Sequence, residues 1–134
     1  MTSITITPLY AALLTFLFVT LSVRIIRLRR SQKIAIGDAG NKQMLRAMRV
    51  HSNFAEYVPL SLVMIFMVEA QGAPALLVHG LGLCLLAGRL SHAYGVSQTH
   101  EKFQFRIAGM ALTFTALMVA ALHLVFTFTA KLVA

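Results

Sequence analysis

The first apolar stretch of the chain decides its fold class. Residues 9–33 read LYAALLTFLFVTLSVRIIRLRRSQK, in which an uncharged run up to Val23 is followed by five basic residues. A helix needs about 20 apolar residues to cross the hydrocarbon core of a bilayer, and residues 9–26 supply them. A signal peptide carries its positive charges before the apolar run and ends in a small-residue cleavage site. Here the charges follow the run, which predicts a retained first membrane span.

The composition agrees with a membrane protein. The 134 residues are 58% hydrophobic and only 12% charged, and their mean hydropathy is +0.78. Soluble domains are about 45–50% apolar and about 25% charged. These values exclude a disordered chain and argue against a soluble enzyme, because a chain of this length has too little interior to bury so much apolar surface. The single cysteine, Cys84, excludes an internal disulfide and a cysteine-based zinc site.

The remaining sequence predicts three more spans. Residues 31–41 hold several turn formers and predict a first loop. A second helix is predicted from Lys42 to about Glu69, ended by the Gln-Gly-Ala-Pro sequence at 71–74. Residues 70–88 and 107–130 lack Asp, Glu, Lys and Arg, and residues 95–105 are polar and predict a loop. We therefore predict one all-α domain over residues 1–134, an integral membrane four-helix bundle, with spans at 9–26, 44–69, 75–94 and 107–130.

The basic residues predict the orientation of these spans. The formal net charge is +8, and 11 of the 12 Lys and Arg residues lie around the first and third connections. Only Lys131 lies elsewhere. Because cytoplasmic loops carry an excess of Lys and Arg, both connections are predicted to be cytoplasmic and both termini non-cytoplasmic, in the inner membrane if the source is bacterial. A charge that follows membrane topology also argues against nucleic acid as the partner.

A stripe of polar residues on the predicted second helix is the main functional signal. Its members, spaced by three, four and three residues, share one helical face and are Arg46, Arg49, Asn53 and Glu56. A charged residue at the centre of a membrane helix costs about 2.5–3.5 kcal/mol, so such groups face a bundle interior or a wet cavity. Two interpretations follow: the polar stripe joins helices, or it lines a ligand site on the cytoplasmic side. We favour the ligand site, because four polar residues exceed what helix association needs.

Further arginines are predicted to lie at the same membrane level. Near the end of the third span come Arg89, His92 and Tyr94, and Arg106 opens the last span. We expect four arginines to converge there: Arg30, Arg49, Arg89 and Arg106. The alternative, in which arginines reach lipid headgroups, is preferred for Arg24 and Lys33. Clustered arginines recognise carboxylates, and a nearby guanidinium favours the thiolate form of a thiol. An anionic ligand with several carboxylates therefore fits.

Three histidines and the cysteine receive less specific predictions. His79 and His123 lie in apolar runs and are predicted to form hydrogen bonds between helices and not to ligate a metal. His51 lies about 200° around the helix from Arg49 and is expected to face a neighbouring subunit or the membrane interface. Cys84 is predicted to be a packing residue.

Residues 49–59, RVHSNFAEYVP, resemble the motif R-x-x-x-N-x-x-E-x-x-P of the MAPEG family, the membrane-associated proteins in eicosanoid and glutathione metabolism. The resemblance implies a homotrimer that binds glutathione between adjacent subunits near the cytoplasmic side. It implies a catalytic role for Arg106 beside the thiol. Together with the residues expected at that membrane level, the predicted glutathione-binding set is Arg29, Arg30, Arg49, Asn53, Glu56, Tyr57, Arg89, His92 and Tyr94. Some family enzymes carry tyrosines where this chain has His92 and Met110.

Three functions follow from these observations. The first is a glutathione-dependent membrane transferase or peroxidase that acts on lipophilic electrophiles, with glutathione as co-substrate and no metal. The second is a non-catalytic lipid- or partner-binding protein of the same fold. The third, a small four-span multidrug transporter, is disfavoured because such transporters depend on an acidic residue in the first span and this span has none. The expected partners are membrane lipid, glutathione, a lipophilic small molecule and further copies of the chain.

Overall fold

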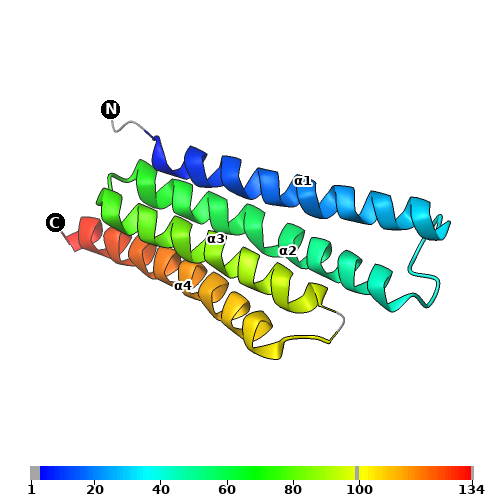
Figure 1. Ribbon diagram of the computed structural model, residues 1–134. Coiled ribbons are helices and arrows are strands. Elements are labelled where there is room, and N and C mark those ends of the chain that lie inside the picture. Colours follow the sequence, from blue (N-terminus) through cyan, green and yellow to red (C-terminus); the bar gives the residue numbers. More distant parts are fainter. Residues whose placement is uncertain (1–3, 99, 134) are drawn as a thin grey trace.

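Four antiparallel helices make up the computed structural model, which describes residues 4–98 and 100–133. They are α1 (Ile6–Gln32), α2 (Lys42–Ala70), α3 (Ala75–Ser97) and α4 (Phe103–Val133), and no strand occurs among these residues. Figure 1 shows both termini at one end of the bundle, and the α1–α2 and α3–α4 connections at the other end, called the connection end below. Each helix is long and apolar enough to cross a membrane. The predicted all-helical, four-span fold is confirmed.

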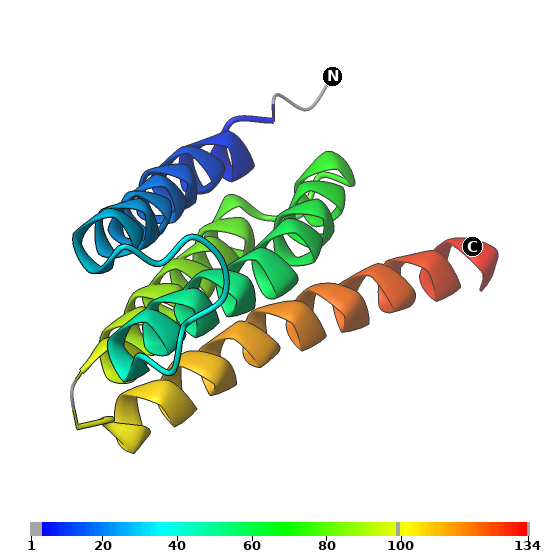
Figure 2. The same ribbon diagram turned by 90° about the vertical axis from the view of Figure 1, so that its right-hand side faces the viewer.

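The arrangement of the helices is asymmetric. Helix α1 packs on α2 and α3, whereas no contact between α1 and α4 is found in the described part of the chain. Figure 2 shows α1 and α4 on opposite sides of the α2–α3 pair. The core between the helices is apolar and includes Leu14, Val50, Ile65 and Leu85. Large apolar side chains such as Phe16 and Phe126 point outward, as expected of surfaces that face lipid.

Local sequence explains the first two connections. Helix α1 ends at Gln32, and the residue that caps it, Lys33, has a left-handed backbone with φ 52°. Helix α2 begins after Asn41, whose side-chain oxygen accepts a hydrogen bond from the Met44 amide at 3.0 Å, as a helix N-cap does. Residues 71–74 separate α2 from α3 as predicted, and Gly72 supplies a positive φ of 79° there.

The α3–α4 connection is shorter than predicted. Polarity suggested a loop over residues 95–105, but α3 continues to Ser97 and α4 begins at Phe103. The reason is a close approach of the two helices at Gly95, where a Cβ atom would lie 2.8 Å from the Arg106 backbone nitrogen. Helical backbone therefore extends on both sides of that contact, whatever the polarity of its side chains.

Small residues hold α3 and α4 together further along the bundle. A Cβ atom on Gly109 would lie 2.6 Å from the Gly88 carbonyl oxygen and 2.6 Å from the His92 backbone nitrogen. Both neighbours are backbone atoms, which cannot move aside cheaply. Close contact through small residues is a common way for membrane helices to associate, and it fixes the rotation of α3 against α4.

Glu69 ties α1 to α2 at the end of the bundle that carries the termini. Its buried carboxylate accepts hydrogen bonds from the backbone amides of Thr5, Ile6 and Thr7 at 2.8, 2.8 and 2.7 Å. These amides begin α1 and have no partners within that helix, and the carboxylate also complements the positive end of the helix dipole. The sequence pattern indicates Glu69 only as the end of a helix.

The histidine predictions have different outcomes. His79 lies 3.1 Å from the Tyr10 hydroxyl through its Nδ1 atom, which confirms a hydrogen bond between helices. His123 makes no side-chain hydrogen bond within residues 4–98 and 100–133. His51 does not face outward, since its Nε2 atom lies 3.0 Å from the Ser22 hydroxyl and its ring stacks on Phe18 of α1. Helical periodicity places His51 off the polar stripe, and only the packing of α1 against α2 covers that face.

Candidate functional site

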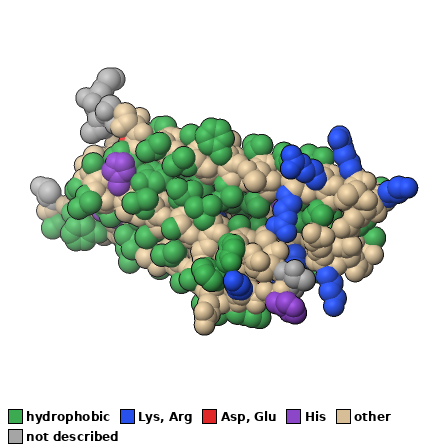
Figure 3. All heavy atoms as spheres, viewed as in Figure 1, with side chains coloured by type: hydrophobic (Ala, Val, Ile, Leu, Met, Phe, Trp, Pro, Cys, Tyr) green, Lys and Arg blue, Asp and Glu red, His purple; other side chains and the backbone are tan. Residues whose placement is uncertain are grey.

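A cavity of about 540 Å³ lies at the connection end between α2, α3 and the start of α4. Its volume lies within the roughly 300–1,000 Å³ range of small-molecule pockets. Figure 3 shows that Lys and Arg side chains gather toward this end, while hydrophobic side chains are the most common coloured type over the rest of the visible face. The lining residues are Lys42, Leu45, Arg46, Arg49, Ser52, Asn53, Glu56, His92, Val96, Glu101 and Arg106.

All four members of the polar stripe line this cavity. Arg49 and Glu56 are exposed on the single chain, whereas Arg46 is partly buried and donates a hydrogen bond to the Val96 carbonyl at 3.2 Å. Glu56 makes no ion pair with any residue that the structure describes. The polar stripe therefore presents two arginines and one carboxylate without an ion pair among the described residues to the cavity.

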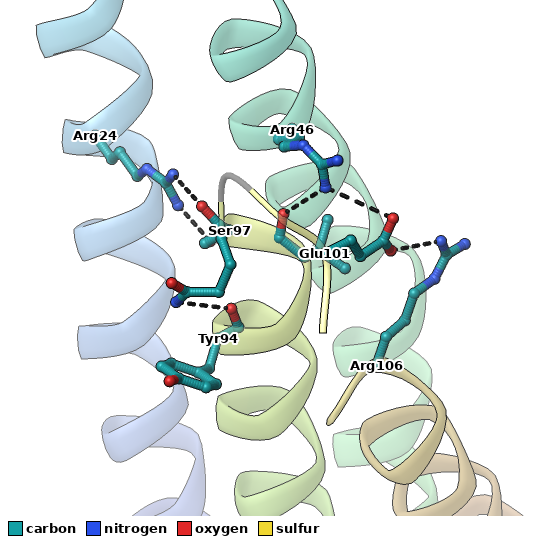
Figure 4. Close-up of polar contacts among 8 residues, drawn as sticks. Arg24, Arg46, Tyr94, Ser97, Glu101 and Arg106 are labelled. Atoms are coloured by element: carbon teal, nitrogen blue, oxygen red, sulfur yellow. Dashed lines mark hydrogen bonds and ion pairs between the residues drawn. The ribbon is translucent and has the colours of Figure 1, made fainter. Parts of the chain in front are cut away.

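An acidic residue that no sequence motif indicates, Glu101, bridges two of the cavity's arginines. The Glu101 carboxylate lies 2.8 Å from Arg106 and 3.6 Å from Arg46. Figure 4 shows these side chains pointing toward one another from α2, the α3–α4 connection and the start of α4. The available sequence signal was the scarcity of acidic residues, because Glu101 is one of only four.

Arg89 lies behind the cavity wall and does not line it. Its side chain is 1% exposed and is held by neutral acceptors. It donates to Asn53 Oδ1 at 2.7 Å and to Thr113 Oγ1 at 3.0 and 2.7 Å. Its guanidinium also lies 5.7 Å from the centre of the Tyr57 ring. Arg89 thus links α3 to α2 and α4, and it reaches the cavity through Asn53.

Other predicted site residues lie outside the cavity of the single chain. Arg29 folds back on the α1–α2 connection and donates to the Gly37 carbonyl at 3.2 Å, and Arg30 is exposed. Tyr57 packs against Phe114. Tyr94 accepts a hydrogen bond from Lys102 at 3.1 Å on the α3–α4 side. Of the four arginines expected to converge, Arg49 and Arg106 therefore line the cavity and Arg89 lies behind it.

Arg24 has a different role from the predicted one. It was expected to reach the lipid headgroups, but its guanidinium donates to the Ser97 hydroxyl and, at 3.5 Å, to the Ser97 carbonyl. Figure 4 shows Arg24 extending from α1 toward Ser97. The last carbonyl groups of a helix have no partners within it, and Arg24 satisfies the carbonyl of Ser97. This interaction fastens α1 to α3 beside the cavity.

The cavity's chemistry is that of a site for an anionic organic ligand. Four cationic side chains face two carboxylates, one of which is already paired, and polar groups of Ser52, Asn53 and His92 lie between them. Among residues 4–98 and 100–133, no three His, Cys, Asp or Glu side chains gather as metal ligands would. Arginines in this setting provide bidentate hydrogen bonds to carboxylates.

The fold and site define an integral membrane four-helix protein with a basic cavity at one end of the bundle. The chain belongs to the MAPEG family, whose sequence model matches residues 7–126. It is 38% identical over 117 residues to the inner membrane protein YecN of Escherichia coli strain K12, a match that covers 87% of this chain and 88% of that protein. YecN of Escherichia coli O6:H1 matches equally well. The name of these relatives states a location and no activity, and with the four apolar helices it supports a multi-pass inner membrane protein.

Proposed function

We propose that this protein is a glutathione-dependent membrane transferase or peroxidase that acts on lipophilic electrophiles. The observation that carries the proposal is the cavity, which combines several cations with the unpaired carboxylate of Glu56. Membership of the MAPEG family supports it, because the family includes glutathione-dependent transferases and peroxidases.

The cavity's charges complement glutathione group by group. Glutathione carries two carboxylates, one ammonium and one thiol. Arg49 and Lys42 make no ion pair within the described residues and are available for its carboxylates. Glu56 suits the ammonium, because a carboxylate near the membrane interior needs an opposite charge. The volume of about 540 Å³ also suits a tripeptide.

Arg106 is proposed to hold the thiol sulfur as thiolate. The thiolate, and not the thiol, is the nucleophile, and a guanidinium in apolar surroundings attracts it more strongly than one in water. Arg106 lies between exposed apolar side chains, since Phe103 is 61% and Ile107 63% exposed. These side chains give a lipophilic second substrate a path from the membrane to the sulfur. His92 also lines the cavity and can donate a hydrogen bond.

We further propose that adjacent subunits complete the site in a homotrimer. Helix α2 rises about 1.5 Å per residue, so the roughly 20 residues before its end span the hydrocarbon core. Asn53 and Glu56 fall within that length, yet Glu56 is exposed on the single chain. Lipid cannot satisfy an exposed carboxylate, which supports a neighbouring subunit that covers this part of the cavity. The number three is the family's, and native mass measurement in detergent tests it; a monomer as the sole species would contradict it.

Binding and turnover by the detergent-purified protein test the proposed function. Calorimetry should detect glutathione binding, and the bound thiol should show thiolate absorption at a pH where free glutathione does not. The protein should then conjugate an aromatic electrophile or reduce a lipid hydroperoxide. Absence of glutathione binding would overturn the proposal.

A second function is favoured by one observation. Met110, where some family enzymes have a tyrosine, directs its sulfur at Arg89, 3.4 Å away, and so supplies no hydroxyl near the cavity. A non-catalytic lipid- or partner-binding protein accounts for this residue. Binding of glutathione without turnover of any electrophile or hydroperoxide would favour this second function.

A further inference from the structure

Glu101 occupies the cationic side of the cavity. Its side chain is only 17% exposed, whereas that of its partner Arg106 is 48% exposed. One of its carboxylate oxygens accepts from Arg106 at 2.8 Å, and the other lies 3.6 Å from Arg46. Glu101 is therefore a resident anion between two of the cavity's four cations (Figure 4).

The charged and titratable groups that face the cavity come from α2, α3, the α3–α4 connection and α4. Helix α2 contributes Lys42, Arg46, Arg49 and Glu56, and α3 contributes His92. The α3–α4 connection contributes Glu101, α4 contributes Arg106, and α1 contributes none. Of these groups, the two arginines bound by Glu101 are the ones already paired within the described residues.

We propose that Glu101 is a specificity-determining residue that competes with the anionic groups of the thiol ligand for Arg46 and Arg106. This inference rests on the proposed function. An anion bound to a guanidinium reduces the attraction that the guanidinium exerts on a second anion nearby. Glutathione must therefore share these arginines with Glu101 or displace it, and a ligand with several anionic groups does so better than one with a single anionic group. The resident carboxylate also keeps the bound thiol protonated to a higher pH than the arginines alone would.

Competition by Glu101 and a purely structural role of Glu101 predict opposite changes in glutathione affinity when its charge is removed. If Glu101 only fastened α2 to α4, removing its charge would loosen the cavity and weaken glutathione binding. If Glu101 competes, the same change frees both arginines and strengthens binding. Glu101→Gln is the suitable variant, because it keeps the size of the side chain and removes the charge.

Asp38 offers a matched control. It lies in the α1–α2 connection, outside the cavity, where its carboxylate accepts a hydrogen bond from the Gly40 amide at 3.1 Å. Asp38→Asn removes one negative charge and keeps that acceptor. The two variants therefore change the net charge equally and differ in whether the lost charge touches the arginines.

The experiment measures glutathione binding and the ionisation of the bound thiol in the full-length protein. Calorimetry should show that Glu101→Gln binds glutathione about two- to fivefold more tightly, as expected for loss of a partly exposed ion pair. The midpoint of the thiolate absorption of bound glutathione should fall by about 0.5 pH unit. Asp38→Asn should match the wild type in both measurements.

Each outcome decides the proposal. Equal or weaker binding by Glu101→Gln, with an unchanged midpoint, would overturn the role of Glu101 and leave the proposed function standing. Absence of glutathione binding by the wild type would overturn both. If Glu101→Gln does not fold, Glu101→Asp keeps the charge and shortens its reach, and it should shift both values in the same direction by less. Failure of both variants to insert would identify Glu101 as a structural tie and overturn the competition.

Discussion

Arg89 donates a hydrogen bond to Asn53 at 2.7 Å, which joins the buried centre of α3 to the polar stripe of α2. The arginine has no acidic partner among the described residues, and its other strong acceptor is the Thr113 hydroxyl of α4. A buried charge without an acidic partner is stabilised by its neutral hydrogen-bond acceptors, so the loss of any one acceptor is costly. This hydrogen bond therefore fixes the side chain of Asn53 in the cavity wall and contributes to the stability of the bundle.

Replacing Asn53 with alanine should destabilise the protein by about 1–3 kcal/mol, because a charged donor loses its partner in a buried position. Thermal unfolding in detergent measures the change, and Ser52→Ala, at an exposed neighbouring position, is the control. In the double variant with Arg89→Met the two effects should not add, since each substitution removes the same interaction. Additive losses would show that the hydrogen bond contributes little.

Gly109→Ala should separate α3 from α4. The new Cβ atom would lie 2.6 Å from two backbone atoms of α3, a contact that cannot be relieved by moving a flexible side chain. A loss of several degrees in the unfolding temperature is expected. Gly80→Ala is the matched control on α3, where an added Cβ meets nothing within 4 Å; it should be neutral or slightly stabilising. Equal behaviour of the two variants would contradict close packing at Gly109.

Arg49→Ala should weaken glutathione binding by at least about tenfold and leave membrane insertion intact. Arg49 lines the cavity and is exposed on the single chain, and removal of one partner from a ligand's charge pair costs about 2 kcal/mol or more. Calorimetry measures the affinity. Arg27→Ala removes an exposed arginine of α1 outside the cavity and should have no effect. Loss of folding in place of binding would favour a structural role for the polar stripe, and unchanged binding would place Arg49 outside the site.

Arg106→Ala should lower turnover about tenfold or more while changing glutathione affinity far less. An interaction that strengthens in the transition state acts on rate, and a tenfold effect corresponds to about 1.4 kcal/mol. Conjugation of an aromatic electrophile at several pH values measures it, and the activity of the variant should require a higher pH. Lys102→Ala is the control, since Lys102 binds Tyr94 and does not line the cavity. Identical pH profiles for wild type and Arg106→Ala would refute the assigned role.

A reporter fused after the C-terminus should be active only if it works outside the cytoplasm. The structure places both termini at the end of the bundle opposite the connections, so they share one side of a membrane. The basic connection end is expected to be cytoplasmic. Strong activity of a reporter that works only in the cytoplasm would reverse the orientation.

The sequence alone determined the four spans, the turns at residues 31–41 and 71–74, and the set of residues that share one face of α2. These are local properties. Bilayer thickness sets the length of an apolar helix, and a period of 3.6 residues decides which side chains lie together. For that reason periodicity alone places four polar residues on one face of α2, and all four line the cavity: Arg46, Arg49, Asn53 and Glu56.

Only the tertiary structure decided what that face meets. Glu101 contacts Arg46 from a distant part of the chain, Glu69 caps a helix more than sixty residues earlier, and Arg89 turns away from the cavity to bind Thr113. Such pairings depend on how each helix is rotated and how closely it approaches its neighbours. The backbone contact between Gly88 and Gly109 sets that rotation for α3 and α4, and no periodicity within a single helix encodes it.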